Sequence, residues 1–282
     1  MTRLAERVAE SGGFLSRTEL SDFDVGDGRR RRLIDTSRGI WNPRDLAATL
    51  SIVSSPDSRY NDEQVEEGFF RYDYRVGSVE GDNAKLRRAS ELGFPLILLL
   101  KMPTGGYAPV LPVFVIADDR PRRQFRILVD ESLRIVADRA DMSELEKRYA
   151  DQITRRRLHQ PMFRAMVVRA YEVQCSICRL RHGDLLDAAH ITPDSEETGL
   201  ASVSNGLSLC KIHHAAYDRN LLAITPGYRV EINQGLLEEV DGPMLKHGLQ
   251  EMHGATILLP TRRSDRPDRE RLALRYEAFK AS

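Results

Sequence analysis

The chain has 282 residues, of which 41% are apolar and 30% charged, and its 42 basic and 42 acidic side chains give a formal net charge of zero. This composition argues against a disordered chain and predicts packed cores, and the length is enough for two ordinary domains. Three cysteines are too few, and odd in number, for the disulfide framework of a small secreted protein. The longest apolar run, 92–100, is too short to cross a bilayer, and the charged N-terminus lacks a signal-peptide core, so we expect a cytoplasmic protein without a membrane partner.

The first half of the chain predicts a β-rich α+β domain. Its N-terminus has a helical pattern, and from residue 69 the sequence alternates so that Phe70, Tyr72 and Tyr74 share one face of a strand. A helix that ends at Gly93 follows, and later strands are separated by the turn at Gly105. The predicted helix spans 83–92, and the predicted strands span 95–101, 110–117 and 125–129.

Helices are expected to connect the two halves. Residues Ser143 to Glu146 fit a capping box, which predicts a helix that runs to about Leu158. Pro161 suits the first position of a second helix that continues to Tyr171. We therefore predict three segments, 1–140, 141–170 and 171–282.

Two short motifs in the last segment have the spacing of zinc ligands. Cys175 and Cys178 form one knuckle, and Cys210 and His213 form another, each with its two donors three positions apart on one tight turn. Four protein ligands leave no open position for water, so the zinc would be structural. The alternative is a buried pair of cysteines with an unrelated third.

A second set of polar residues lies among these motifs, and a structural zinc does not need it. His190 ends an apolar segment that predicts a strand, where a histidine on its own is as well explained as a core residue. Asn205 follows, and then His214 and Asp218 share one face of a short helix because they are four positions apart. His213 points away from that face, so one helix can serve two metals.

These residues, in this order, resemble the HNH nuclease family over roughly residues 171–225. The resemblance implies a ββα-metal domain, in which a hairpin and a helix hold one divalent cation. It also implies that His190 is the general base, Asn205 the middle residue and His214 the final histidine. The 171–282 segment is thus expected to be a zinc-stabilised HNH domain with a C-terminal extension.

The chemistry implied by the resemblance fits the residue types. An imidazole with its ordinary pKa of ~6.5 can take a proton from the water that attacks a DNA phosphate. A Mg²⁺, Mn²⁺ or Ni²⁺ ion held by His214 and Asp218 would offset the charge that develops. Many HNH proteins carry a further metal ligand immediately before the base, where this chain has Ala189. Asp187 is nearby but would face away from His190 on a regular strand, so as a third ligand it would need a bulge or would leave the task to Asp218.

A segment of the first half also carries a resemblance. Residues 69–75, with Asn83 and the apolar stretch 113–116, resemble the N-terminal part of bacterial predicted restriction endonucleases and the PUA/SRA-like modules that read modified bases. The Tyr-Asp-Gly signature of SRA-like modules is matched at Tyr72 and Asp73, whereas Tyr74 stands in the third position. Tyr72, Asp73, Tyr74 and Asn83 could supply the aromatic faces and hydrogen bonds that an everted base needs. The alternative is that the aromatic side chains fill the inner face of a sheet.

Arginines are concentrated in the stretches 29–32, 155–157 and 262–275. Local basic stripes can bind phosphates while the total charge stays zero, and the predicted terminal helix, 267–280, can follow a phosphate backbone. The alternative is that these arginines are solvated surface. The rest of the C-terminal region predicts strands over 228–232 and 257–260, a helix after Asp241, and structural or surface roles for His247 and His253.

Together these patterns predict an α+β protein with an N-terminal DNA-recognition domain, helices, and an HNH domain. The predicted function is a metal-dependent DNA endonuclease of restriction type that acts on double-stranded DNA. A modification-dependent enzyme that reads modified cytosine is favoured, because the chain has a candidate reader domain and no methyltransferase signature. A single HNH site cuts one strand, so a homodimer is the simplest way to cut both. The alternatives are a non-catalytic zinc-stabilised DNA-binding protein and a homing or toxin-type HNH nuclease.

Overall fold

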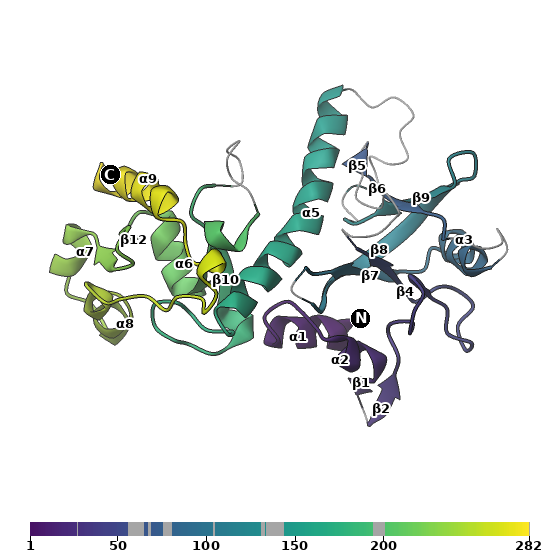
Figure 1. The fold of residues 1–282 in the computed structure, drawn as a ribbon, viewed down its shortest axis with the longest axis horizontal. Helices are drawn as coiled ribbons and strands as arrows, with labels where there is room; N and C mark the ends of the chain where they lie inside the picture. Colours follow the sequence, from purple (N-terminus) through teal and green to yellow (C-terminus); the bar gives the residue numbers. More distant parts are fainter. Residues whose placement is uncertain are drawn as a thin grey trace. The chain divides into compact units, whose positions relative to one another are not determined.

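The computed structural model of the chain describes residues 1–26, 28–55, 65–66, 69–75, 81–103, 105–130, 133, 144–193 and 201–281 (Figure 1). Contacts divide the chain into an N-terminal unit, Met1–Val8 with Gly13–Met162, and a C-terminal unit, Ala9–Gly12 with Phe163–Ser282. Both units contain helices and strands, so the predicted α+β class is confirmed. The segment limits 1–140, 141–170 and 171–282 stay predictions. None of the described helices is long and apolar enough to cross a membrane.

The N-terminal unit is built on a seven-stranded sheet with the order β3-β4-β7-β8-β9-β6-β5. Strands β4 and β7 are parallel, and the other neighbours are antiparallel. The first part of β8 pairs with β7 and its last part with β9, so this one long strand joins the two halves of the sheet. The strands are β3 (Ile40–Trp41), β4 (Ser51–Ser54), β5 (Val65–Glu66), β6 (Phe69–Asp73), β7 (Leu96–Lys101), β8 (Tyr107–Asp119) and β9 (Gln124–Leu128).

The predicted alternation in β6 is confirmed. Phe70, Tyr72 and Tyr74 are buried, whereas Arg71 and Asp73 are half-buried. Helix α3 (Asp82–Leu92) ends at Gly93 as predicted, since that residue adopts a left-handed φ of 62°. The α3 helix lies against β8 (Figure 1).

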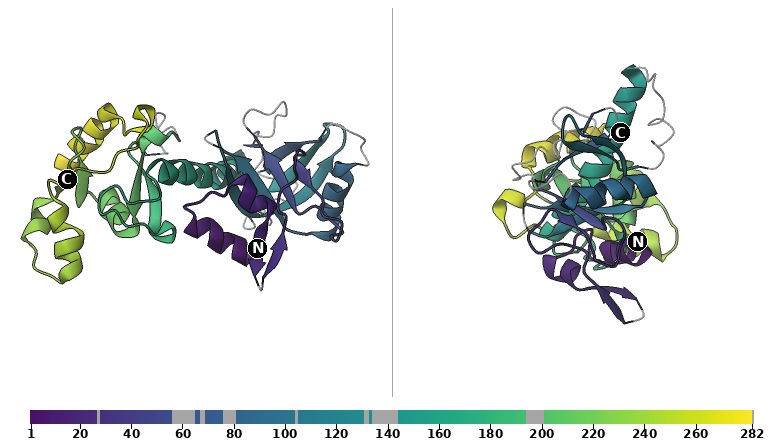
Figure 2. Two further views of the ribbon diagram at one scale, coloured as in Figure 1. Left: turned by 60° about the horizontal axis from the view of Figure 1, so that its bottom comes forward. Right: turned by 90° about the vertical axis from the view of Figure 1, so that its right-hand side faces the viewer.

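Two helices and a hairpin lie near the chain start. Helix α1 (Thr2–Glu10) is followed by α2 (Arg17–Ser21), whose first turn is closed by a capping box between Ser16 and Glu19. Strands β1 (Phe23–Gly26) and β2 (Arg29–Arg31) form a separate antiparallel hairpin that extends away from the sheet (Figure 2).

Helix α5 (Glu144–Ala170) is one continuous helix, so the prediction of two helices with Pro161 opening the second is wrong. Proline in a helix interior removes one hydrogen bond and costs about 3 kcal/mol. Packing on both sides of Pro161 offsets that cost. Ala150 packs in a cluster of the N-terminal unit, and Phe163 packs in a cluster of the C-terminal unit. The predicted capping box includes Ser143, which lies outside the described residues.

The C-terminal unit holds two small antiparallel sheets, β10 (Leu186–His190) with β11 (Gly206–Cys210), and β12 (Leu222–Ile224) with β13 (Val230–Ile232). A core of buried aliphatic residues lies between these strands and the helices around them. The helices are α6 (Lys211–Asp218), α7 (Gln234–Glu238), α8 (Pro243–Gly248) and α9 (Arg269–Lys280), with short 3-10 turns η2 (Gly183–Leu185), η3 (Val203–Asn205), η4 (Gln250–Met252) and η5 (Arg263–Asp265).

Most of the predicted C-terminal elements are present. The strand predicted over 228–232 is β13, the helix predicted after Asp241 is α8, and the predicted terminal helix is α9. The predicted strand over 257–260 is wrong. Only Thr256 forms a β-bridge there, with Arg229, while the buried Ile257 donates one backbone hydrogen bond to Tyr228. The apolar run reflects core packing without a sheet partner.

Candidate functional site

The first zinc knuckle is shaped by backbone hydrogen bonds. The Arg179 N–H donates to the Cys175 carbonyl, and the Cys175 N–H donates to the Leu180 carbonyl. Arg179 adopts a left-handed φ of 65°, which reverses the chain directly after the second cysteine. The Ser176 N–H donates to the Ser208 carbonyl of β11, so this turn is held against the strand that carries Cys210.

The four predicted zinc donors converge on one point. The donor atoms of Cys175, Cys178, Cys210 and His213 all lie within 4.8 Å of one another. The Nδ1 atom of His213 is 3.1 Å from the sulfur of Cys210 and 3.5 Å from that of Cys175. Zinc binds three thiolates and one imidazole in a tetrahedron with bonds of about 2.3 Å to sulfur and about 2.0 Å to nitrogen. The cluster fits a zinc ion and leaves no position for a reacting water.

The remaining nitrogen of His213 fixes the orientation of the ring. Its Nε2 atom lies 2.8 Å from the carbonyl oxygen of Gly248, at the end of α8, and donates to it when Nδ1 faces the metal. Such a partner is typical of metal-binding histidines. The sequence analysis missed Gly248 because no motif marks a backbone acceptor 35 residues along the chain from its histidine.

The titration of this cluster is consistent with metal binding. Hydrogen bonds with the thiols of Cys178 and Cys210 lower the pKa of Cys175. Burial acts to lower the pKa of His213, but hydrogen bonds with Cys175 and Cys178 raise it to about 9. Zinc binding would need the three thiolates and a neutral Nδ1, so it would release the protons that these groups hold.

The neighbouring histidine, His214, faces two carboxylates from the other side of α6. Its Nδ1 atom is 3.4 Å from Asp187 on β10, and its Nε2 atom is 3.3 Å from Asp218, one turn later on α6. A hydrogen bond with His214 lowers the pKa of Asp187 to about 2, against the effect of burial and with the help of Lys211, whose ammonium lies 2.6 Å away. The same hydrogen bond raises the pKa of His214.

The hairpin register explains how Asp187 reaches α6. Strands β10 and β11 pair without a bulge from Leu186 opposite Cys210 to His190 opposite Gly206. Side chains alternate along a strand, so Asp187 and Ala189 share one face and His190 lies on the other. The bulge that would re-aim Asp187 is absent, which leaves the alternative in which Asp218 takes that task. Asp187 reaches His214 from the face that it shares with Ala189.

His190 lies on the hairpin face that packs against α5. Its ring stacks on Phe163 with a centroid separation of 3.9 Å and an angle of 13°, and its Nε2 atom is buried. The opposite residue on β11 is Gly206, where a Cβ atom would lie only 2.4 Å from Val167. Phe163 and Val167 therefore occupy the space that a side chain at residue 206 would need. Phe163 was not predicted, because a single aromatic residue in a helix carries no signal of this contact.

Asn205 clamps the chain just beyond His190. Its side-chain oxygen accepts from the Thr192 N–H at 2.9 Å, and its Nδ2 donates to the Thr192 carbonyl at 3.0 Å. The Asn205 carbonyl also accepts from the Ile191 N–H. Asn205 is fully buried, so these bonds are made away from water and hold the segment that follows His190 in one conformation.

The donors of Asp187, His214 and Asp218 are less well arranged around one ion than the four zinc donors are. Asp187 and Asp218 lie at opposite ring nitrogens of His214, so the three groups do not surround one point. Carboxylate oxygens suit Mg²⁺ or Mn²⁺, imidazole nitrogen suits Ni²⁺, and Mg²⁺ keeps several waters when few protein ligands bind it. The Nε2 atom of His214 lies 3.3 Å from the carboxylate of Asp218, so these two groups could hold such an ion together.

The predicted base-reading residues in the N-terminal unit are bonded to their own surroundings. The buried Tyr72 hydroxyl donates to the Gly39 carbonyl at 2.9 Å, and the Arg75 guanidinium lies 4.0 Å from the centre of the Tyr72 ring. The amide of Asn83, which is 1% exposed, bonds to the backbone N–H and carbonyl of Arg75. These contacts support the alternative in which the side chains stabilise the sheet.

The two remaining candidates of this group are engaged as well. The Tyr74 hydroxyl bonds to the carboxylate of Asp118, and Gln124 donates to Asp73 at 2.7 Å. Tyr74 is buried and Asp73 is half-buried. The structure thus places all four candidates close together in and beside β6, with their polar groups directed at neighbours within the unit.

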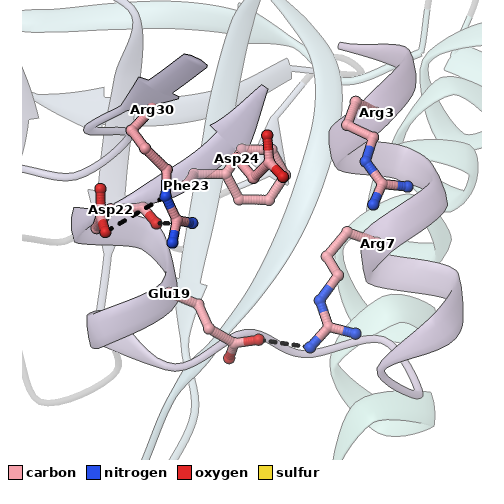
Figure 3. Close-up of a pocket in the computed structure, with 7 residues that line it drawn as sticks. All are labelled: Arg3, Arg7, Glu19, Asp22, Phe23, Asp24 and Arg30. Atoms are coloured by element: carbon pink, nitrogen blue, oxygen red, sulfur yellow. Dashed lines mark hydrogen bonds and ion pairs between the residues drawn. The ribbon is translucent and has the colours of Figure 1, made fainter. Parts of the chain in front are cut away.

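The arginine run at 29–32 is largely compensated. Arg30 lies 3.6 Å from Asp22, Arg31 bonds to Asp45, and Arg32 lies over the Trp41 ring. A cavity of about 270 Å³ beside the β1–β2 hairpin also has arginines and acids close together (Figure 3). Three arginines and three acids line it with one phenylalanine: Arg3, Arg7, Glu19, Asp22, Phe23, Asp24 and Arg30. Such balanced charge favours neither an anion nor a cation.

Residues 175–225 match the family described as HNH endonuclease. A comparison with curated proteins finds no match. Among solved structures, the chain is similar to the modification-dependent TagI restriction endonuclease, with 17% identity, 82% of each chain covered and a TM-score of 0.31. It is also similar to the type IV phosphorothioation-dependent restriction endonuclease ScoMcrA, with 12% identity, 59% of this chain and 49% of the other covered, and a TM-score of 0.23.

The zinc cluster, the hairpin with His190 and Asn205, and the helix with His214 all fall inside the matched segment. The resemblance of this segment to HNH endonucleases, which the order of these residues predicts, is confirmed by the family match.

Proposed function

We propose that this protein is a metal-dependent DNA endonuclease of restriction type. The observation that carries the proposal is the clamp of Asn205 on Thr192, two residues after His190, inside a segment that matches the HNH endonuclease family. A zinc-stabilised DNA-binding protein without activity would need the four zinc donors but not this clamp, nor the His214 cluster beside it.

His190 is proposed as the general base. Because its Nε2 atom is buried, Nδ1 is the nitrogen that would accept a proton from water. The water oxygen then bonds to phosphorus while the bond from phosphorus to the 3′ oxygen breaks, and the 3′ oxygen gains a proton from solvent. Stacking on Phe163 and the clamp at Thr192 hold the imidazole in place for this transfer.

His214 and Asp218 are proposed as protein ligands of a Mg²⁺, Mn²⁺ or Ni²⁺ ion. A divalent cation bound there would offset the negative charge on the phosphate and the leaving 3′ oxygen. We assign Asp187 to the imidazole rather than to the ion, since it lies at Nδ1 while Asp218 lies at Nε2. A carboxylate at Nδ1 directs Nε2 towards a metal. Asp187 would thus orient the metal-binding imidazole, and would not itself replace the metal ligand that many HNH proteins have at the position of Ala189.

The face alternation of β10 sets a condition on the substrate. His190 lies on one face of the hairpin and Asp187 with His214 on the other, but His190 is also the last residue of its strand. The proposal therefore requires a scissile phosphate that reaches both His190 and the ion held by His214 and Asp218.

The N-terminal unit is proposed to select the DNA, and the selected DNA is proposed to carry modified bases such as modified cytosine. This part rests on the resemblance of the Tyr72 and Asp73 region to SRA-like modules. A homodimer on double-stranded DNA would bring two sites to the two strands.

A plasmid-nicking assay tests the nuclease. Full-length protein, with its zinc retained, is expected to nick a supercoiled plasmid when Mg²⁺, Mn²⁺ or Ni²⁺ is added, and to stop when the added metal is chelated. His190→Ala should lower the rate by about 10²–10⁴-fold, the contribution of a general base, while zinc content and melting temperature stay unchanged. Nicking at the parent rate by this variant would exclude His190 as the base.

Binding measurements with the full-length His190→Ala protein test the reader. Duplexes of one sequence, with and without 5-methylcytosine or 5-hydroxymethylcytosine, should differ in affinity. Equal affinities for all three duplexes would remove recognition of these cytosine modifications and leave the nuclease proposal intact.

A further inference from the structure

The segment between residues 260 and 269 is rich in arginine and lies outside the family match. Its four arginines are Arg262, Arg263, Arg266 and Arg269, and the segment contains the short turn η5. Arg262 and Arg263 are exposed, and neither side chain forms an ion pair or a hydrogen bond with any residue that the structure describes. This distinguishes them from Arg30 and Arg31, which lie beside acids.

The acids of the same segment are occupied by local bonds. Asp268 caps helix α9, since its side chain accepts from the backbone N–H groups of Glu270 and Arg271. Asp265 accepts from the hydroxyl of Ser264 at 3.1 Å. The positive charges of Arg262 and Arg263 therefore remain directed at solvent.

The fold brings this segment to the end of the hairpin at which His190 lies. Turn η5 packs against η3, the turn that contains Asn205. The Asp268 N–H donates to the Ser204 carbonyl at 2.9 Å, and Asn205 clamps Thr192. Two short links thus join the arginine segment to the chain just after His190.

The segment is also held in shape by contacts that do not use its first two arginines. The Tyr228 hydroxyl donates to the Pro267 carbonyl at 3.0 Å, and Arg266 donates to the Pro260 carbonyl at 3.3 Å. Arg269 lies 4.9 Å from the centre of the Tyr228 ring. Arg262 and Arg263 are therefore presented from an ordered turn, and their removal leaves these contacts in place.

We propose that Arg262 and Arg263 bind backbone phosphates of the DNA that lie close to the scissile phosphate. The inference rests on the proposed DNA endonuclease function and adds a phosphate-binding surface outside the HNH motif. An exposed guanidinium without an acidic partner can pair with a phosphate without first breaking an ion pair. Contacts of this kind fix the position of the duplex and carry no sequence information.

The salt dependence of DNA binding tests this surface. Each phosphate contact contributes about 0.9 to the slope of log affinity against log salt concentration. In the full-length His190→Ala protein, with a fluorescent 30-base-pair duplex as the probe, Arg262→Ala and Arg263→Ala should each lower the slope by about 0.9, and the double variant by about 1.8. Arg262→Lys with Arg263→Lys should retain the slope, because lysine keeps the charge.

Arg181→Ala is the matched control. Arg181 is exposed, forms no ion pair with a described residue, and lies just before η2, at the end of the hairpin away from His190. It should leave the slope unchanged. Zinc content and melting temperature identify a folding defect, and Arg262→Gln with Arg263→Gln should give the same loss of slope in a folded protein.

The outcomes separate this proposal from the nuclease proposal. A slope that is unchanged in the double variant, or lowered equally by Arg181→Ala, overturns the phosphate surface while the nuclease stands. Failure of the parent to bind any duplex overturns both. Nicking by the His190→Ala protein at the same rate as the unsubstituted protein, on addition of Mg²⁺, contradicts the base assignment, whereas a slope lowered by about 1.8 in that same background still supports the surface.

Discussion

The two faces of α6 differ in how far the protein alone assembles a metal site. On the zinc face, four donors lie within 4.8 Å of one another, and His213 is fixed by Gly248. On the adjacent face, His214 lies between two carboxylates that do not surround a common point. A structural ion needs a closed shell, whereas a catalytic ion must keep positions for water and phosphate. We therefore propose that His213 serves stability and that His214 serves the reaction.

Replacing each of the two histidines by alanine tests the comparison directly. His213→Ala should give the largest effect on stability of all the variants considered. Structural zinc contributes on the order of 10 kcal/mol to the folding of small zinc domains. His213→Ala should therefore release zinc and lower the melting temperature of the C-terminal unit strongly. His214→Ala is the matched control, since it should keep zinc and melting temperature while nicking is lost. Metal analysis and calorimetry provide the readouts, and a zinc-replete, stable His213→Ala protein would reverse the assignment of the two faces.

Asp187 offers a smaller effect that sharpens the assignment of the second face. Loss of a partner that orients a metal-binding histidine lowers metal affinity by about 10–100-fold, which we expect for Asp187→Ala. Asp187→Asn should stay close to the parent, because an amide oxygen still accepts a hydrogen bond from Nδ1. Titration calorimetry with Mn²⁺ gives the affinities, and nitrogen-15 NMR of neutral His214 in the absence of catalytic metal should show the proton on Nδ1. An equal loss for Asn and Ala would make Asp187 a metal ligand.

Gly206→Ala should give the smallest effect and concerns the face that holds His190. The new Cβ atom would lie 2.4 Å from Val167 and 3.0 Å from Phe163, and such overpacking costs about 1–3 kcal/mol. Calorimetry of the C-terminal unit should show the loss, and Gly206→Ala with Val167→Ala should recover part of it. Gly227→Ala is the control, because its Cβ atom would meet only Thr225 at 3.7 Å. Equal stability of Gly206→Ala and Gly227→Ala would mean that α5 does not pack on the hairpin as described.

The charge pattern shows why local sequence could not decide which arginines are available to bind phosphates. The run 29–32 and the segment 262–269 look alike as sequence, since both are dense in arginine. In the structure Arg30 lies beside Asp22 and Arg31 beside Asp45, whereas Arg262 and Arg263 have no acid beside them among the described residues. Whether an arginine has an acidic partner depends on residues up to 14 positions away along the chain. A run of like charges in the sequence does not reveal such partners.

The sequence by itself determined the zinc donors, the order of the HNH residues and the alternation of β6. These features depend on short spacings, three positions for a knuckle, four for a helix face and two for a strand, and local geometry converts such spacings into directions. Pro161 is the counterexample, because packing on both sides overrode a strong local signal.

Only the tertiary structure decided the partners of the functional groups. Asp187 meets His214, His190 stacks on Phe163, and Ser204 accepts from Asp268, in each case across 27 or more residues of sequence. Such pairs form where separate elements pack together, and their positions follow from burying apolar faces rather than from any local pattern. The motif predicts which residue types are present in the HNH segment, whereas the tertiary structure sets how their side chains are oriented.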